Sequence, residues 1–332
     1  MKTEQGIALV DRDEDGVDRA FREDVLTGLK QKQKAIPARW LYDDSGSQLF
    51  EDITDLPEYY PTRAETEILN ARGEEFSRLI GEGRAVVEFG SGSSVKTPLL
   101  LRAIHPTAYV PLDISGDFLR QSAAALAEKF PAIDVYPVEA DFMREVDLPE
   151  KVHSLKKLGF FPGSTIGNMV PRTAVDLLRS MRATLGAEHG EKPLLLIGMD
   201  LVKDREVLEA AYDDSKGVTG EFNLNLARRI NRELSGTIPV DALRHKAPWN
   251  DDFARIEMHL EAIRDIDFEV AGRRFSMRKG ETIHTENSHK FTRRSANTLL
   301  LAGGWTPRAR WTDKKGLFSL ILAEATEKRD AP

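Results

Sequence analysis

The sequence of 332 residues contains no cysteine, which excludes disulfide bonds, thiolate catalysis and cysteine-ligated metals. It also lacks an apolar run long enough to cross a bilayer, and its first residues lack the apolar core of a secretory signal. We therefore predict a cytoplasmic protein that has no membrane partner.

The chain also has no excess of basic residues over acidic ones. The net charge is -7, so we predict that nucleic acid is not a partner. The seven histidines form no His-Glu-x-x-His pair, and we expect no metal site. Hydrophobic residues make up 41% of the chain, which is ordinary for a globular protein with one large domain or two modest ones. We expect a monomer.

Apolar stretches alternate with helix-like stretches through the middle of the chain. This alternation is typical of a parallel, doubly wound α/β sheet, which binds ligands at the carboxyl ends of its strands. The expected strands are Ala85–Phe89, Ala108–Leu112, Ile133–Val138, Lys156–Phe161 and Pro193–Ile197. The expected helices are Thr62–Ile80, Thr97–Ile104, Gly116–Lys129 and Thr173–Leu185.

The alternation ends at Asp200. A long helical region at 204–235, interrupted near Gly217 and Gly220, precedes strand-like stretches at 254–263, 268–270 and 274–277. Strand signals at 298–302 and 317–323 favour an antiparallel pair that completes the sheet. We predict a first domain of residues 61–199 and 289–332, and a second, discontinuous α+β domain of residues 1–60 and 200–288.

One segment has the composition of a loop although it is rich in aromatic residues. It runs from Trp40 to Pro61 and contains Tyr42, Phe50 and Tyr59. Two interpretations remain open: a packed surface loop, or a lid or wall over a ligand.

The glycine turn Glu88-Phe89-Gly90-Ser91-Gly92 follows the first expected strand. Acids follow the next two expected strands, at Asp113 and at Asp141-Phe142. Glycine lets the backbone turn sharply and touch a ligand, and this order of elements indicates a nucleoside site. A third glycine, which dinucleotide-binding turns carry, is replaced by Val95. The two acids are also suited to be helix caps or loop acids, so that alternative stays open.

These motifs in register resemble those of the Rossmann-type class I methyltransferases that use S-adenosylmethionine. The resemblance implies that Asp113 accepts bonds from the ribose hydroxyls, and that Asp141 accepts one from the adenine amino group. It further implies that the Phe142 amide donates to the adenine ring, that Gly90 contacts the cofactor, and that Lys96 neutralises its carboxylate.

Further motifs narrow the family. They are Tyr42-Asp-Asp-Ser-Gly-Ser-Gln-Leu-Phe50, Leu56–Glu65, Gly163-Ser-Thr-Ile-Gly-Asn168, Tyr212-Asp-Asp with Phe222-Asn-Leu-Asn225, and Glu281–Lys290. From Tyr42 to Leu322 the chain resembles the L-histidine Nα-methyltransferases of ergothioneine biosynthesis. The resemblance implies three methyl transfers from S-adenosylmethionine to L-histidine, which give hercynine.

The same resemblance implies the substrate contacts. Asn168 and Tyr212 hold the carboxylate of L-histidine and orient its amine, and Tyr59, Glu286 and Ser288 hold its imidazole. Met258 packs on the imidazole, and Tyr42 and Phe50 close the site. Tyr42 and Asn168 are the residues for which a part in catalysis is implied.

Methyl transfer needs positioning more than acid–base help, so the residue types present suffice without a metal or a nucleophile. The group that accepts the amine proton stays open. Other readings of the chain are a methyltransferase for another amino acid such as tryptophan or prenylated tryptophan, a nicotinamide-dependent oxidoreductase, and a non-catalytic S-adenosylmethionine-binding protein. Glu286 also fits a surface acid in a polar turn, and an isolated tyrosine is usually a packing residue.

Overall fold

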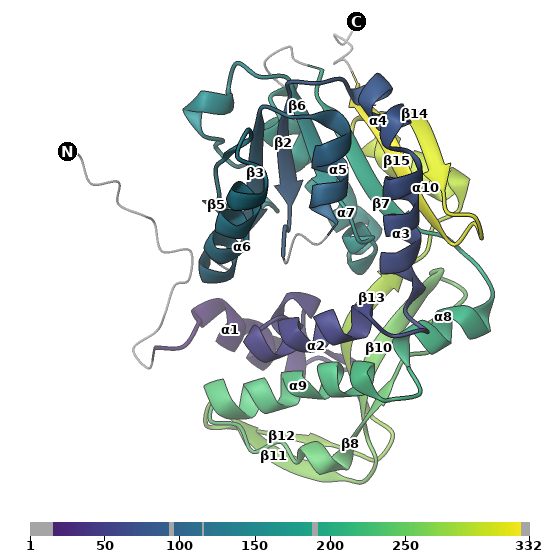
Figure 1. The fold of residues 1–332 in the computed structure, drawn as a ribbon. Helices are drawn as coiled ribbons and strands as arrows, with labels where there is room; N and C mark the ends of the chain where they lie inside the picture. Colours follow the sequence, from purple (N-terminus) through teal and green to yellow (C-terminus); the bar gives the residue numbers. More distant parts are fainter. Residues whose placement is uncertain (1–15, 93–95, 115, 188–191, 327–332) are drawn as a thin grey trace, which may run out of the picture. The chain divides into compact units, whose positions relative to one another are not determined.

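The computed structural model describes residues 16–92, 96–114, 116–187 and 192–326 (Figure 1). The chain divides into two compact units. One contains the residues up to Tyr60 together with Lys203–His289, and the other contains Pro61–Val202 together with the residues from Lys290 onward. The chain therefore passes between the units three times, after Tyr60, Val202 and His289. Val95, the residue in place of a third glycine, lies outside the described residues.

The larger unit contains an eight-stranded mixed sheet with the order β14-β15-β7-β6-β2-β3-β4, in which β5 also pairs with β3. Four neighbouring strands of this sheet run parallel to one another: β7 (Leu194–Asp200), β6 (Lys157–Phe161), β2 (Ala85–Phe89) and β3 (Ala108–Asp113). The last two strands, β14 (Trp305–Thr312) and β15 (Phe318–Ala325), are antiparallel. The α/β architecture expected from the sequence is thus confirmed.

Helices cover both faces of this sheet (Figure 1). Successive side chains of a strand point to opposite faces, so both faces of a central strand must be apolar. On β2, Val86 joins the core formed with α3 (Tyr60–Ala71), α4 (Gly73–Ile80), α5 (Thr97–Ile104) and α6 (Gly116–Lys129). Val87 joins the core on the other face, with α7 (Pro171–Thr184) and α10 (Arg293–Ala302).

Three expectations for this unit are wrong. Residues 298–302 are the end of α10, whose first turn has a reciprocal cap between Thr292 and Ser295, and the strand follows at β14. A short apolar run suits a buried helix as well as a strand, which explains the error. The expected helix 62–80 is two helices that meet at Arg72. The expected strand 133–138 is reduced to the two-residue strands β4 (Asp134–Val135) and β5 (Val138–Glu139).

The smaller unit has a sheet of order β1-β13-β10-β8, with β9 paired to β10, and a separate β11–β12 hairpin. The strands are β1 (Lys34–Ala35), β8 (Leu243–Lys246), β9 (Trp249–Asn250), β10 (Arg255–Ala262), β11 (Ile266–Val270), β12 (Arg273–Met277) and β13 (Thr282–His289). The helices include α1 (Arg19–Leu29), α2 (Asp44–Thr54), α8 (Arg205–Tyr212) and α9 (Val218–Glu233). The strands expected at 254–263, 268–270 and 274–277 are confirmed.

Two expectations for this unit are also wrong. The segment expected to be a loop forms α2, whose first turn is capped by the carboxylate of Asp43. The predicted break at Gly217 is confirmed, because this residue has φ +75° and precedes α9. Gly220 lies inside α9 and does not interrupt it.

In the described part of the chain, none of the helices has the length and apolar character of a membrane span.

The pairing of β10 with β13 contains a bulge. Met258 lies opposite Glu286, whereas the next residue, His259, lies opposite His284. Thr285 is therefore the extra residue on β13. Bulges of this kind redirect side chains and are common beside functional sites.

Candidate functional site

The glycine turn at the carboxyl end of β2 is joined to the end of β3. The amides of Gly90 and Ser91 donate to the Leu112 carbonyl at 2.9 and 3.1 Å. The Gly92 amide donates to the Asp113 carboxylate at 3.0 Å. Gly90 has φ +72° and Gly92 has φ +46°, a region that side chains with a Cβ rarely adopt. The structure thus brings the turn and the first predicted acid together.

Phe142 lies over the same turn. A Cβ added to Gly90 would lie 3.3 Å from the Phe142 ring, which also packs edge-on against Phe89 and Phe161 at centroid distances of 6.2 Å. Asp141 accepts a bond from the Met143 amide at 3.0 Å, a local contact that is compatible with either reading of this acid. Four of the predicted residues, Gly90, Asp113, Asp141 and Phe142, therefore meet at the carboxyl ends of β2, β3 and β5.

Lys96 has a partner that the sequence analysis missed. Its ammonium group is bonded to Glu65 of α3, a carboxylate with no exposed surface. The Gly163 amide donates to both oxygens of Glu65, at 2.9 and 3.1 Å. Glu65 therefore joins α3 and the start of α5 to the turn that follows β6. An acid near the start of an expected helix is too common a pattern to indicate this role.

Asn168 ends the 3₁₀ helix η3 (Thr165–Asn168), which follows that turn. The turn places Ser164 at φ +58°, and the Ser164 hydroxyl accepts a bond from the Asp200 amide at 2.9 Å. These bonds hold Asn168, which is half-buried, at the carboxyl end of β6. β6 pairs with β2, so Asn168 and the glycine turn follow neighbouring parallel strands.

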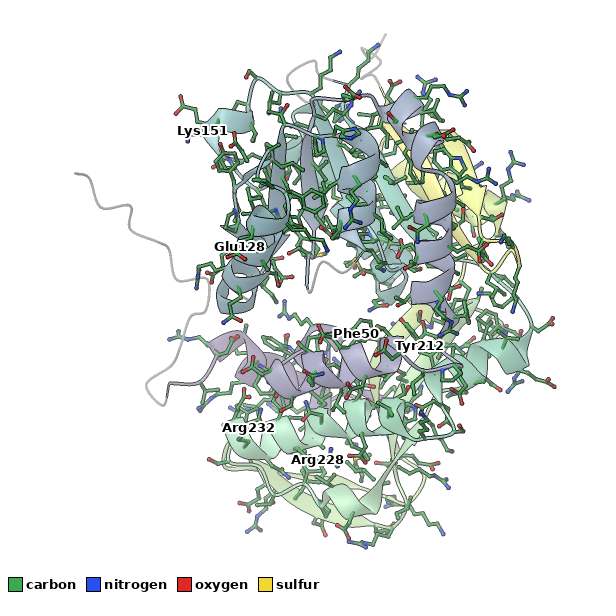
Figure 2. The ribbon with its side chains drawn as sticks, in the orientation of Figure 1. Phe50, Glu128, Lys151, Tyr212, Arg228 and Arg232 are labelled. Atoms are coloured by element: carbon green, nitrogen blue, oxygen red, sulfur yellow. The ribbon has the colours of Figure 1, made fainter. Side chains whose placement is uncertain are left out.

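Five aromatic rings in the smaller unit form a continuous cluster. Tyr42 contacts Phe50 and Phe222 edge-on, with centroid distances of 5.6 and 5.4 Å. Phe50 reaches Tyr59 at 6.2 Å, and Tyr59 reaches Tyr212 at 6.1 Å. Phe50 on α2 and Tyr212 at the end of α8 are labelled in Figure 2. The tyrosines that the sequence singled out thus pack together, and Phe222 of α9 belongs to the same cluster.

Glu286 and Ser288 join this cluster from β13. The Tyr212 hydroxyl and the Ser288 hydroxyl are 2.7 Å apart, and the Tyr42 hydroxyl donates to Glu286 at 3.4 Å. Glu286 is only 8% exposed, which excludes the reading as a surface acid. Met258 lies directly opposite Glu286 on β10 and is buried. Burial first, and then the neighbouring Glu286, raise the pKa of Tyr42 well above its usual value.

The predicted residues thus fall into two sets. The larger unit contains Gly90, Lys96, Asp113, Asp141, Phe142 and Asn168. The smaller unit contains Tyr42, Tyr59, Tyr212, Met258, Glu286 and Ser288. Among the residues that the structure describes, histidine, aspartate and glutamate form no group of three that could hold a metal ion.

Known proteins resemble the chain over almost its whole length. A family described as histidine-specific methyltransferase, SAM-dependent, matches residues 21–325. The histidine N-alpha-methyltransferase of Mycolicibacterium smegmatis is 40% identical over an alignment of 320 residues, which covers 93% of this chain and 96% of that protein. The enzyme of the same name from Mycobacterium tuberculosis is 40% identical over 321 residues, with the same coverage. The solved structure of the CcbJ methyltransferase from Streptomyces caelestis aligns with 86% of this chain and 100% of that chain, at 14% identity and a TM-score of 0.47.

Proposed function

The chain belongs to the S-adenosylmethionine-dependent, histidine-specific methyltransferases, and from this membership we propose that it trimethylates the α-amine of L-histidine. The product is hercynine, and the reaction is the first step of ergothioneine biosynthesis. The observation that supports this substrate best is the buried pair Glu286 and Ser288 beside Tyr212 and Met258.

These four side chains suit an imidazole. A carboxylate accepts a ring N–H in a charge-assisted bond, and hydroxyl groups both donate and accept. Met258 offers an apolar surface opposite Glu286. The tyrosine rings of the cluster suit a product that carries a quaternary ammonium group, because aromatic faces attract cations. Tyr59, Glu286 and Ser288 hold the imidazole in this proposal, and Tyr212 holds the carboxylate.

The residues at the glycine turn fit the methyl donor. S-adenosylmethionine supplies an electrophilic methyl group on its sulfonium sulfur. The turn has no Cβ at Gly90 that would come between its backbone and the Phe142 ring. Asp113 has the acceptor oxygens for ribose hydroxyls, and Asp141 with Phe142 recognises adenine. An ammonium group has three donors, so Lys96 can hold Glu65 and a cofactor carboxylate together.

Positioning of a neutral amine supplies most of the rate enhancement in this proposal, because an in-line methyl transfer disperses charge and needs little proton transfer. The raised pKa of Tyr42 keeps its phenol protonated at neutral pH. Tyr42 therefore donates to Glu286 and orients the site.

We also propose that the larger unit binds the methyl donor and that the smaller unit is a discontinuous α+β domain that binds L-histidine. A monomer in the cytoplasm remains our prediction.

Mass spectrometry of reactions with S-adenosylmethionine and each common amino acid tests the function. We expect three added methyl groups on L-histidine and none on L-tryptophan. Methylation of another amino acid in place of L-histidine would show a different acceptor. Binding of S-adenosylmethionine without any turnover would show a non-catalytic protein.

A further inference from the structure

The bulge on β13 determines which way Glu286 faces. Residues two apart in a regular strand share a face of the sheet. Here His284 lies opposite His259, and their rings stack at 4.8 Å, whereas Glu286 lies opposite Met258. Because Met258 and His259 are successive residues of β10, they point to opposite faces. The extra residue, Thr285, therefore places Glu286 on the face opposite to His284.

A side chain of α9 and a backbone carbonyl of β10 hold Thr285. Its hydroxyl donates to the Asn223 carbonyl oxygen at 2.7 Å and lies 3.1 Å from the Met258 carbonyl. Thr285 and Asn223 are both buried, and Asn223 has no exposed surface. A hydroxyl has one proton, so Thr285 donates mainly to Asn223, the partner at the shorter distance.

The bonds of Asn223 continue to His245. With its oxygen occupied by Thr285, the Asn223 amide nitrogen lies 2.9 Å from His245 Nδ1 and donates to the His259 carbonyl at 3.1 Å. His245 Nδ1 must then be an acceptor, which assigns the proton of a neutral ring to Nε2. This Nε2–H donates to the Tyr212 carbonyl at 2.8 Å.

The environment of His245 agrees with a neutral ring. Burial lowers the pKa of His245 and outweighs the opposing effects of the Tyr212 carbonyl, Asp213 and Asp214. His245 lies against α9 at Gly220, one turn before Asn223, where an added Cβ would be 3.5 Å from the His245 Cβ, an ordinary van der Waals contact. In the chain of bonds from Tyr212 to Thr285, every donor has an acceptor.

We propose that Thr285, Asn223 and His245 form a brace that positions Glu286 and Tyr212 and thereby sets the preference for an imidazole substrate. The brace joins the backbone at Glu286, through the bulge, to the backbone at Tyr212, whose hydroxyl contacts Ser288. It thus acts on two of the groups that we assign to substrate recognition, Glu286 and Tyr212. Its three members are positioning residues. The inference rests on the proposed function, because it presupposes that Glu286 binds the substrate ring.

Thr285→Val tests the brace because it keeps the branched shape and removes only the hydroxyl. We expect KM for L-histidine to rise about tenfold, the effect of losing one hydrogen bond beside the site, while KM for S-adenosylmethionine stays within about twofold. The preference for L-histidine over 3-(2-thienyl)-L-alanine, whose ring lacks an N–H, should fall by a similar factor. Thr285→Ser retains a hydroxyl and should restore both values.

Thr282→Val is the matched control, because it makes the same change in the same strand at a residue outside the brace. A Thr285→Val variant with unchanged KM and ring preference would overturn the proposal, as would failure of Thr285→Ser to restore them. Calorimetry of L-histidine binding in the presence of S-adenosylhomocysteine separates the two proposals. Wild-type protein that binds L-histidine without methylating it contradicts the function only, and wild-type protein that does not bind it contradicts both.

Discussion

At the scale of single residues, Glu88 is an acid in an unfavourable place. It is buried at the end of β2 and accepts bonds from Thr97 at 2.7 Å and from Tyr109 at 2.5 Å. Burial raises its pKa from 4.5 to about 7 despite these two bonds and the nearby Lys96. A raised carboxyl pKa means that the folded protein binds the proton more tightly than the unfolded chain. Proton binding by Glu88 therefore stabilises the folded protein fully below pH 4.5, and this stabilisation is lost as pH rises towards about 7.

Glu88→Gln should therefore stabilise the protein in a pH-dependent way. At pH 5 the variant should be more stable than the wild type by less than about 1 kcal/mol, because folded Glu88 is neutral there and only the unfolded chain carries the ionised side chain. At pH 8 the variant should be more stable by up to about 3 kcal/mol, the free energy that corresponds to the raised pKa. Urea unfolding at both pH values measures the difference. An equal difference at pH 5 and pH 8 would contradict the assignment.

Glu286→Ala should affect one substrate only. Loss of a charge-assisted bond of roughly 1.5–3 kcal/mol lowers kcat/KM for L-histidine about tenfold or more. Binding of S-adenosylmethionine should be nearly unchanged, since the predicted cofactor residues belong to the other unit. Steady-state kinetics and calorimetry provide the two measurements. Loss of cofactor binding with histidine binding retained would show that Glu286 has been assigned to the wrong ligand.

The sequence predicts residues of this kind far better than it predicts the brace. Gly90, Asp113 and Glu286 stand in motifs whose order can be read along the chain. Thr285 lies beside Glu286 in one such motif, but its role depends on a bulge between strands and on a bond to Asn223, 62 residues away. The pairing register depends on contacts between strands in the folded sheet, so no local sequence pattern predicts it.

At the scale of elements, Asp43 joins α2 to α9. Its carboxylate caps α2 through the Gly46 amide at 2.8 Å and accepts bonds from Asn225 at 2.7 Å and Arg232 at 2.6 Å. Figure 2 labels Arg232 on α9. Burial would raise the pKa of Asp43, but the three hydrogen bonds together lower it. The acid thus stabilises the fold above its unfolded-state pKa, and this stabilisation is lost as pH falls through the lower folded-state pKa.

Asp43→Ala should lower the free energy of unfolding at pH 7 by roughly 1–3 kcal/mol, through the lost cap and the lost bonds to α9. The difference from wild type should shrink towards pH 3, where the native carboxylate is increasingly protonated. Asp44→Ala is the control, because Asp44 is an exposed acid in the first turn of the same helix. If both variants lost the same stability, the bonds to α9 would contribute nothing.

Elements that the sequence predicted wrongly share a physical cause. The apolar run at 298–302 reads as a strand, but the cap formed by Thr292 and Ser295 starts a helix before it. The polar, aromatic segment before Phe50 reads as a loop, although Asp43 caps it and its helix packs against α9. In both cases an end signal and tertiary contacts outweigh the local propensity, which is a weak guide by itself.

At the scale of the whole molecule, three crossings of the chain connect the two units. A ligand stabilises the state that binds it, by about 2.7 kcal/mol when its concentration is 100 times its Kd. We propose separate units for the two substrates, so substitutions should remove the two stabilising effects independently. Thermal unfolding with S-adenosylhomocysteine alone, and then with added L-histidine, measures each effect in the intact chain.

Wild-type protein should show a higher Tm with S-adenosylhomocysteine and a further rise with L-histidine. Asp113→Ala should lose most of the first rise, because the proposed acceptor for the ribose hydroxyls is gone. Glu286→Ala should retain the first rise and lose the second. Loss of the S-adenosylhomocysteine effect in Glu286→Ala would mean that this residue supports cofactor binding, and the assignment of one substrate to each unit would then be wrong.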